Sequence, residues 1–326
     1  MQTMVSKMRW RTARPWRWSC ASVGLAAGVS AWLCAMPVSA QVDLSGEWAP
    51  VRAEDSVGNP ELGDWVGLPL NDAARLRSSA WDASIYTLPE WQCRPHGSAY
   101  ISRGPSQVRI WRDVDPVSRE TSNWNFEWLR SVTRPVYMDG RPHPSPNAIH
   151  TWAGFSTGEW IGDTLRIRVT HLKQEYLRRN GVFHSDQIEV TQYLTRRGNY
   201  LTYVVITYDP VYLTEPVIRS TEYQLVPNQQ IPPYPCTVVT EVDRPKGVVP
   251  HYLPGTNADT AWFANRYKIP LDVVMSGAAN MYPEIRSRIP RSMGGLGPER
   301  SATPAVPAPP PAGGAAAPPT PAPARR

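Results

Sequence analysis

Four of the six histidines lie within residues 137–186, the stretch whose residue types are best suited to chemistry. His143 stands between two prolines after an Asp-Gly turn, and His184 precedes Ser185-Asp186. Imidazole titrates near neutral pH, and a neighbouring carboxylate tunes its pKa. The sequence therefore supports the hypothesis that His143 and His184 form an acid–base pair at loop or strand-end positions.

Other side chains of the same stretch would support that pair. Asp139 or Asp186 would fix the tautomers of the two histidines by accepting a ring N–H. Tyr137 and Arg141 would polarise a bound substrate, because both side chains donate hydrogen bonds. These residues complete a site that needs no cofactor.

Two other interpretations of the histidines stay open. His143, His150 and His184 would suit a zinc- or copper-like ion, although neither HExxH nor HxxxH spacing is present. Alternatively, the histidines satisfy buried backbone carbonyls in a loop that crosses between strands. In the hypothesis without a metal, His150 and Trp152 are candidate substrate-binding residues.

Two arginines share one face of a predicted strand. Period-two alternation over 164–170 places Leu165, Ile167 and Val169 on one face of the strand. Arg166 and Arg168 then occupy the opposite face. Pointing into a barrel, they would anchor a carboxylate or another anion; pointing outward, they would form a solvated face.

The body of the chain has the pattern of many short β-strands. Alternation or β-branched and aromatic content predicts strands over 107–112, 123–129, 132–138, 164–170, 187–194, 200–208, 217–225 and 237–242. The turn residues at 195–199 predict a tight hairpin between two of these strands. We therefore expect a mainly β fold, an antiparallel barrel or sandwich, with loop-rich extensions at 41–100 and 243–290.

Two weaker patterns complete the expected fold. Residues 71–79 and 172–179 are compatible with short helices that cap one end of the sheet. Trp124, Phe126 and Trp128 alternate along one strand, so they either line a cavity or pack in the core.

The two ends differ from the body in composition. Residues 1–40 combine a basic start, an apolar stretch and small residues before position 41, which predicts a Sec-type signal peptide cleaved after Ala40. Residues 291–326 are rich in proline and alanine, which predicts a disordered tail. We therefore expect a periplasmic or secreted protein with one barrel-like domain over 41–290 and no stable membrane insertion.

Charge and motifs narrow the function classes. The formal charge of +6 is concentrated at the two ends, and the body is close to neutral. Such a body offers no electrostatic footprint for nucleic acid. The sequence contains no P-loop, GxSxG or GxGxxG motif in a suitable setting, which argues against kinases, serine hydrolases and dinucleotide enzymes. A small molecule is the expected partner, while the oligomeric state is open.

Cys93 and Cys236 are the two cysteines that follow the predicted signal peptide. In an oxidising compartment a lone pair of this kind typically forms a disulfide, which constrains the unfolded chain. The competing interpretation is a catalytic or metal-binding thiol, and it has no CxxC or Cys/His spacing to support it.

A set of short phrases occurs across the chain, at 44–48, 93–97, 137–144, 151–165, 181–186, 209–216, 251–255 and 281–284. Together they resemble a widespread family of secreted bacterial proteins. The resemblance implies an exported, lipocalin-like antiparallel β-barrel, and it implies no particular chemistry.

Two phenylalanines depart from the pattern of that family. Phe155 stands where many relatives have histidine, and Phe183 stands where many have proline. Both changes make the suspected site more apolar, which favours an apolar or aromatic ligand. We therefore expect an exported small-molecule-binding barrel, with acid–base lyase, hydratase or isomerase chemistry as its enzymatic form. A non-catalytic periplasmic or envelope-associated binding protein and a metal-dependent or metal-binding protein stay open as alternatives.

Overall fold

The computed structural model describes residues 42–51, 60–102, 104 and 106–290. The predicted signal peptide and the predicted tail lie outside these residues. In the described part of the chain, no helix has both the length and the apolar character needed to cross a membrane.

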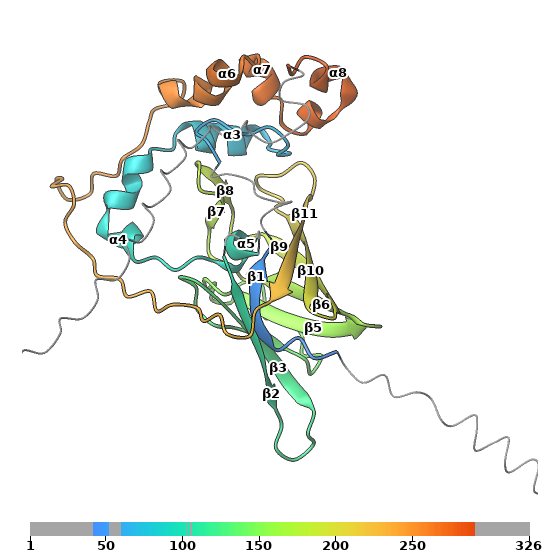
Figure 1. Ribbon diagram of the computed structural model, residues 1–326. Helices are drawn as coiled ribbons and strands as arrows, with labels where there is room; N and C mark the ends of the chain where they lie inside the picture. The colour runs from blue at the N-terminus through green and yellow to red at the C-terminus, as the bar shows by residue number, and fades with distance from the viewer. Residues whose placement is uncertain (1–41, 52–59, 103, 105, 291–326) are drawn as a thin grey trace, which may run out of the picture. The chain divides into compact units, whose positions relative to one another are not determined.

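Strands of the described residues close into a nine-stranded barrel (Figure 1). They are β1 (Gly46–Pro50), β2 (Val108–Val114), β3 (Thr121–Trp128), β4 (Arg134–Tyr137), β5 (Phe155–Ile161), β6 (Thr164–Thr170), β9 (Glu189–Arg197), β10 (Tyr200–Tyr208) and β11 (Val217–Leu225). Their order is β1-β11-β10-β9-β6-β5-β4-β3-β2, and β1 also pairs with β2. The β4–β5 pair is parallel and the other neighbouring pairs are antiparallel. The expected mainly β fold is confirmed, as a barrel rather than a sandwich.

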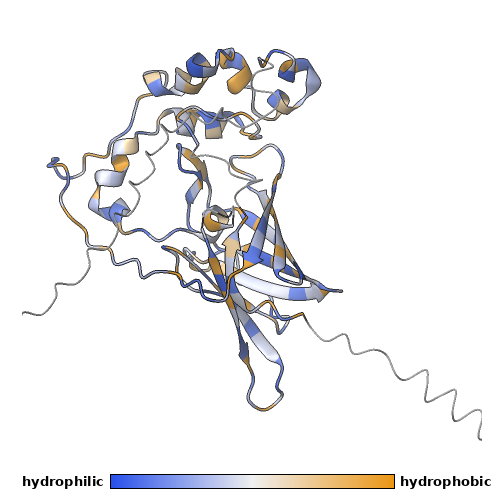
Figure 2. Cartoon of the chain, in the orientation of Figure 1, coloured by the Kyte–Doolittle hydropathy of each residue, from blue (hydrophilic) through white to orange (hydrophobic). Residues whose placement is uncertain are grey.

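Period-two patterns explain the strands with the sharpest bounds. In β6 the aliphatic residues are buried and the arginines are exposed, and the predicted bounds of β6, β10 and β11 match the observed ones. Hydrophobic and hydrophilic residues are interspersed along the barrel strands (Figure 2). The predicted hairpin joins β9 to β10 through Gly198-Asn199, with Gly198 at φ 61°.

Large side chains fill the interior of the barrel. The most deeply buried of them are Trp48, Trp124, Phe126, Trp128, Arg134, Tyr203 and Tyr223. Trp124, Phe126 and Trp128 are therefore core residues, which decides between the two interpretations of their alternation. The barrel interior contains one buried arginine among aromatic rings.

Two predicted elements are wrong. Residues 172–179 contain no helix; they contain β7 (Glu175–Arg178), which pairs with β8 (Val182–His184) in a separate two-stranded sheet. Glu175, Tyr176 and Leu177 are consecutive and all buried, so this segment has no solvent-facing stripe for an amphipathic helix. Residues 237–242 form no strand, and Val238 and Val239 are exposed without a ladder partner.

Short helices lie between β1 and β2 and again after β11. The predicted helix is confirmed as α3 (Asp72–Ser79), whose N-cap residue Asn71 accepts a hydrogen bond from the Ala74 N–H at 3.0 Å. The others are η1 (Ala83–Thr87), α4 (Pro89–Gln92), α5 (Ser98–Ile101), η2 (Ala258–Ala261), α6 (Trp262–Tyr267), α7 (Leu271–Val274), η3 (Gly277–Met281) and α8 (Pro283–Arg286). Residues from α3, α6 and α7 share a second apolar cluster with Trp65 and Leu213.

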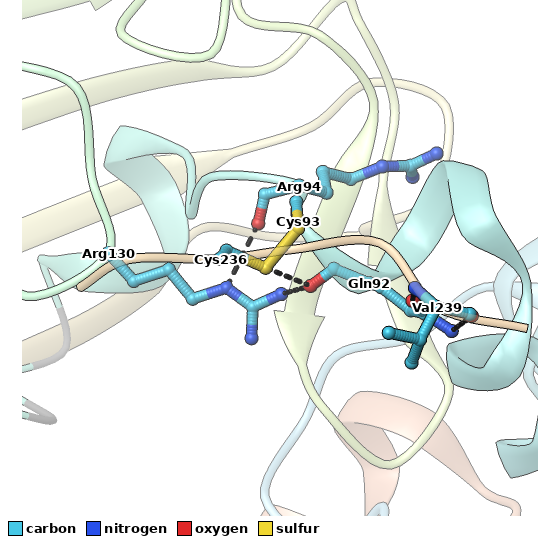
Figure 3. Close-up of a disulfide and its surroundings, with 6 residues drawn as sticks. All are labelled: Gln92, Cys93, Arg94, Arg130, Cys236 and Val239. Carbon is cyan, nitrogen blue, oxygen red and sulfur yellow. Dashed lines mark hydrogen bonds between the residues drawn. A yellow bond between two sulfur atoms is a disulfide. The ribbon is translucent and has the colours of Figure 1, made fainter. Parts of the chain in front are cut away.

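A disulfide attaches the long segment after β11 to α4 (Figure 3). The sulfur atoms of Cys93 and Cys236 lie 2.11 Å apart, as the sequence predicts for this pair. Next to it, Gln92 Nε2 donates to the Val239 carbonyl at 2.8 Å, and the Val239 N–H donates to Gln92 Oε1 at 2.8 Å. Arg130 donates to the Gln92 carbonyl. The disulfide and these hydrogen bonds thereby fix the segment after β11 at Cys236 and Val239.

Candidate functional site

Two pockets in the described part of the chain contain five of the twelve predicted catalytic and substrate-binding residues. The histidine pocket, of about 620 Å³, is lined by His143, His150, Arg168, His171, Asp186 and Glu189 among others. The aromatic pocket, of about 430 Å³, is lined by Leu76, Arg77, Trp81, Trp91, Phe183 and His251 among others. Neither is built from the side chains that fill the barrel interior.

Hydrogen bonds fix the proton positions of two histidines in the histidine pocket. His171 Nε2 lies 2.9 Å from the Ser145 carbonyl, which only accepts, so this nitrogen carries the proton. In the neutral ring, His171 Nδ1 then accepts from the Thr170 hydroxyl at 2.7 Å. Thr170 in turn accepts from His143 Nδ1 at 2.6 Å. His143 Nε2 is left to accept from the Thr157 hydroxyl at 2.9 Å. Every nitrogen of these two rings is therefore occupied.

His143 is held in its neutral form. Burial lowers its pKa, and the nearby positive charge of Arg168 lowers it further. Its ring meets the edge of Phe155, with ring centroids 5.2 Å apart. Phe155, at the start of β5, therefore supplies part of the apolar environment that disfavours the charged imidazole.

His150 has the accessible lone pair of this pocket. Its Nδ1 lies 3.0 Å from the Leu172 carbonyl and must donate to it, so Nε2 of the neutral ring is unprotonated. Nε2 has no hydrogen-bond partner among the described residues. The exposed Asp186 lines the same pocket. A substrate proton in the histidine pocket would therefore meet His150 rather than His143.

His184 lies elsewhere, buried in β8 with 1% of its surface exposed. Its Nδ1 donates to the Ser185 carbonyl at 2.8 Å, and its Nε2 is buried without a partner among the described residues. Burial lowers the pKa of His184. Glu175 faces it across the β7–β8 pair, and Asp209 accepts hydrogen bonds from the neighbouring Ser185. His184 thus belongs to a buried polar cluster.

The structure does not assemble the expected histidine sets. His143 lines the histidine pocket and His184 does not, so the two rings do not share a pocket as an acid–base pair would. Of the three predicted metal ligands, His143 and His150 line the histidine pocket and His184 does not. Among the described residues, no three or more His, Cys, Asp or Glu side chains are placed to hold a metal ion.

Asp139, Arg141 and Tyr137 interact with one another. Arg141 Nε and Nη2 contact the Asp139 carboxylate at 2.9 and 2.6 Å, and this pairing lowers the Asp139 pKa. The guanidinium lies 3.9 Å from the centre of the Tyr137 ring. Tyr137 packs in turn against Phe155 at 5.5 Å. Asp139 is therefore paired with an arginine and does not orient a histidine.

Arg166 and Arg168 point outward, which decides for the solvated face and against an anchor inside the barrel. Both pair with glutamates on the outer face because β6 turns its aliphatic side inward. Arg166 pairs with Glu159, and Arg168 binds both oxygens of Glu189 at 3.1 and 3.0 Å. Arg168 thereby reaches the rim of the histidine pocket.

Trp152 lies outside both pockets. It is half-buried, with Arg94 and Lys173 each 5.2 Å from its ring centre. Its carbonyl accepts a hydrogen bond from the Ser98 N–H at 3.2 Å. These contacts give Trp152 a packing role between neighbouring cations.

The aromatic pocket is walled by rings that contact one another. The ring centres of Trp91 and Phe183 lie 6.3 Å apart in an edge-to-face arrangement, and those of Tyr176 and Phe183 lie 4.6 Å apart. The Arg77 guanidinium lies 4.5 Å from the centre of the Phe183 ring. The pocket therefore combines apolar walls with one cationic group.

Close backbone packing positions those walls. Gly181 has φ of 94°, and a Cβ added to it would lie 2.9 Å from Trp81 Cβ. On the opposite side, the Tyr252 N–H donates to the Ala80 carbonyl at 3.0 Å, and Asn257 Nδ2 donates to the Ser79 carbonyl at 2.9 Å. These bonds hold the segment that carries His251 against α3.

Sequence reasoning places Phe183 in a site but misses Trp81, Trp91 and Arg77. The tryptophans stand among loop and short-helix residues that show no periodicity, so nothing in the sequence brings them to Phe183. His171 is visible as one histidine of the cluster at 143–184, and its place beside His150 depends on the fold.

Comparison with known proteins provides no functional assignment, so the function is inferred from the geometry of the two pockets. No protein-family model, no curated protein and no solved structure matches the chain.

Proposed function

We propose that this protein binds a small aromatic or otherwise apolar molecule in the aromatic pocket. The observation that carries the proposal is an open pocket of about 430 Å³ with Trp81, Trp91 and Phe183 in its walls. Small-molecule sites in proteins are typically concave and apolar, with a few polar groups that fix orientation. Aromatic rings on several sides offer both faces and edges to a flat ligand.

The polar groups at the pocket indicate the kind of ligand. Arg77 lines it and forms no ion pair among the described residues, while its guanidinium is held over Phe183. His251 also lines the pocket, and its Nδ1 donates to the Val249 carbonyl at 2.8 Å. An aromatic molecule with a carboxylate or another anionic group would place its ring on the aromatic walls and its charge at Arg77.

Binding of 1-anilinonaphthalene-8-sulfonate, an aromatic anion, tests the proposal by fluorescence titration. Leu76 lines the pocket and is 55% exposed, so Leu76→Glu introduces a negative charge without opening a core cavity. The affinity should fall at least about tenfold, equivalent to about 1.4 kcal/mol. Leu271→Glu is the matched control, because Leu271 is a 43% exposed helical leucine outside the pocket. Equal affinity in both variants would count against the proposal.

The histidine pocket supports a second candidate, cofactor-independent acid–base conversion of a small molecule bound in that pocket. His150 Nε2 carries it, because this lone pair is free among the described residues and faces a pocket that also contains Asp186. Lyase, hydratase and isomerase reactions all require such a proton acceptor.

The test begins with native mass spectrometry of protein from its own host, which identifies any organic molecule that is carried along. That molecule is then incubated with the wild type and with His150→Gln. Turnover by the wild type should fall about 100-fold or more in the variant, the range for loss of a general base. A molecule that the wild type leaves unchanged would favour a non-catalytic binding protein instead.

We also propose that the chain is exported as a member of the secreted family that it resembles. The basic and apolar composition of residues 1–40 supports export, and the Cys93–Cys236 pair is typical of an oxidising compartment. The periplasmic protein should begin at Gln41 on N-terminal sequencing. An intact N-terminus in the cytosolic fraction would contradict export.

A further inference from the structure

Arg134 is a buried cation without an acidic partner. It lies on β4 with 1% of its surface exposed, and no carboxylate of the described residues forms an ion pair with it. A charged group taken out of water is costly unless it is paired and hydrogen-bonded. The barrel interior therefore contains an unbalanced positive charge.

One edge of the Arg134 guanidinium is unused. Its face packs against the rings of Phe126 and Trp128, at 4.9 and 5.4 Å from the ring centres. Nη1 donates to Gln192 Oε1 at 2.9 Å. Nε and Nη2 are buried without hydrogen-bond partners among the described residues. These two nitrogens share the edge whose parallel N–H groups match the two oxygens of a carboxylate.

Buried side chains near Arg134 supply further donors, and the Tyr203 hydroxyl interacts with the guanidinium itself. Buried polar atoms without a partner in the described part of the chain include Trp128 Nε1, Gln192 Nε2, Tyr203 Oη and Tyr223 Oη. Burial raises the pKa of Tyr203 to about 12, so the hydroxyl beside Arg134 is neutral and does not offset the charge. Tyr203 and Tyr223 are neighbours, with ring centres 6.3 Å apart. The interior thus contains several donors around one cation.

We infer that the barrel interior binds a small carboxylate-type anion on the Nε–Nη2 edge of Arg134. Two oxygens of the anion would accept from this edge, and the Tyr203 and Tyr223 hydroxyls would donate to the remaining lone pairs. The anion would neutralise the buried charge and satisfy the unused donors together. This site is separate from the aromatic pocket, whose lining does not include Arg134.

Thermal unfolding in sodium formate, the smallest carboxylate, tests the site. The protein is first unfolded and refolded in sodium gluconate, an anion too large for the enclosed interior, and formate then replaces gluconate at constant ionic strength. The wild-type Tm should rise by about 5 °C at formate concentrations well above the dissociation constant. Arg134→Met should abolish the rise. Arg166→Met, which removes an arginine from the outer face, should keep it.

A high-resolution crystal structure of the wild type grown in formate decides the matter even if Arg134→Met does not fold. Planar density in contact with Nε and Nη2 supports the inference. Ordered water alone on that edge overturns it, as does an equal formate response in the wild type and Arg134→Met. Both readouts are independent of 1-anilinonaphthalene-8-sulfonate binding, so this inference and the proposed function can fail separately.

Discussion

The histidine pocket and the aromatic pocket are neighbours along the chain with opposite chemistry. Phe183 lines the aromatic pocket, and Asp186, three residues later, lines the histidine pocket. Likewise, Pro210 lines the histidine pocket, and Tyr212, two residues later, lines the aromatic pocket. A short step along the backbone thus separates a hydrogen-bonded polar surface from an apolar one.

The two pockets also differ in how the chain builds them. Most of the histidine pocket comes from one stretch, 143–189, and hydrogen bonds order its rings. The aromatic pocket joins α3, the segment 81–91, Phe183 and the segment 249–251, and packing orders its rings. Substitutions in the aromatic pocket should therefore cost more stability than those in the histidine pocket.

The largest effect is expected for Phe183→Ala. Phe183 is buried and contacts Trp91, Tyr176 and Arg77, so its loss should lower the free energy of unfolding by about 3–5 kcal/mol in urea titration. Phe155→Ala, in the half-buried ring beside His143, is the comparison and should cost clearly less. Equal losses would show that the two pockets do not differ in this respect.

Gly181→Ala should have the next largest effect, about 2–4 kcal/mol. The positive φ strains any Cβ, and the added carbon would contact Trp81 at 2.9 Å. Gly140→Ala is the matched control, because Gly140 has φ of 71° and open space around it, so only the strain of about 1 kcal/mol applies. The difference in unfolding free energy between the two variants measures how tightly Trp81 packs against residue 181. Equal losses would mean that Trp81 moves aside to accommodate the added carbon.

The histidines should make stability depend on pH. Burial lowers the pKa of His184 and of His143 below the unfolded value of 6.5, so the folded protein binds fewer protons than the unfolded chain. The free energy of unfolding should stay level above pH 6.5 and fall as the pH drops from there through the folded pKa, by at most about 1.4 kcal/mol per pH unit per proton.

Urea titrations at several pH values, with His184→Gln and His143→Gln, check this expectation. Each variant should flatten the pH dependence, and His184→Gln should flatten it more, because His184 is buried and His143 is half-exposed. Unchanged slopes in both would mean that other groups control the pH dependence.

Arg168→Met should have the smallest effect. The Arg168–Glu189 pair is exposed on the outer face, so its loss should change the free energy of unfolding by less than about 1 kcal/mol. The same substitution removes a positive charge that lowers the His143 pKa, so the His143 pKa measured by NMR should rise. A larger loss of stability would show that the rim of the histidine pocket contributes to the fold.

The sequence predicts the strands whose bounds depend on local alternation of residues. Strand β10 was predicted to the residue, because β-branched and aromatic residues run between clear turn signals. The helix predicted over 172–179 is wrong because β7 is buried on every side by α5 and β8, which no local pattern shows. The parallel β4–β5 pair was unforeseen for the same reason.

The candidate sites follow the same rule. The residues of the histidine pocket could be predicted because they are close in sequence. Arg134 had one local signal, since it shares the inward register of β4 with the buried Val136, where a charge is unusual. Trp81 and Trp91 gave no such signal, because only the tertiary fold brings them to Phe183.

Barrel closure has a consequence for the order of folding. Strand β1 is made first, yet it hydrogen-bonds both β2 and β11, with Trp48 opposite Leu225 on one side and Val108 on the other. Until β11 has emerged from the ribosome, β1 has only one of its two partners. Loop-closure entropy delays such long-range pairing, so closure should be a late and slow event in folding. A chain that stops before β11 would leave the open edges of β1 and β10 free to pair with other chains.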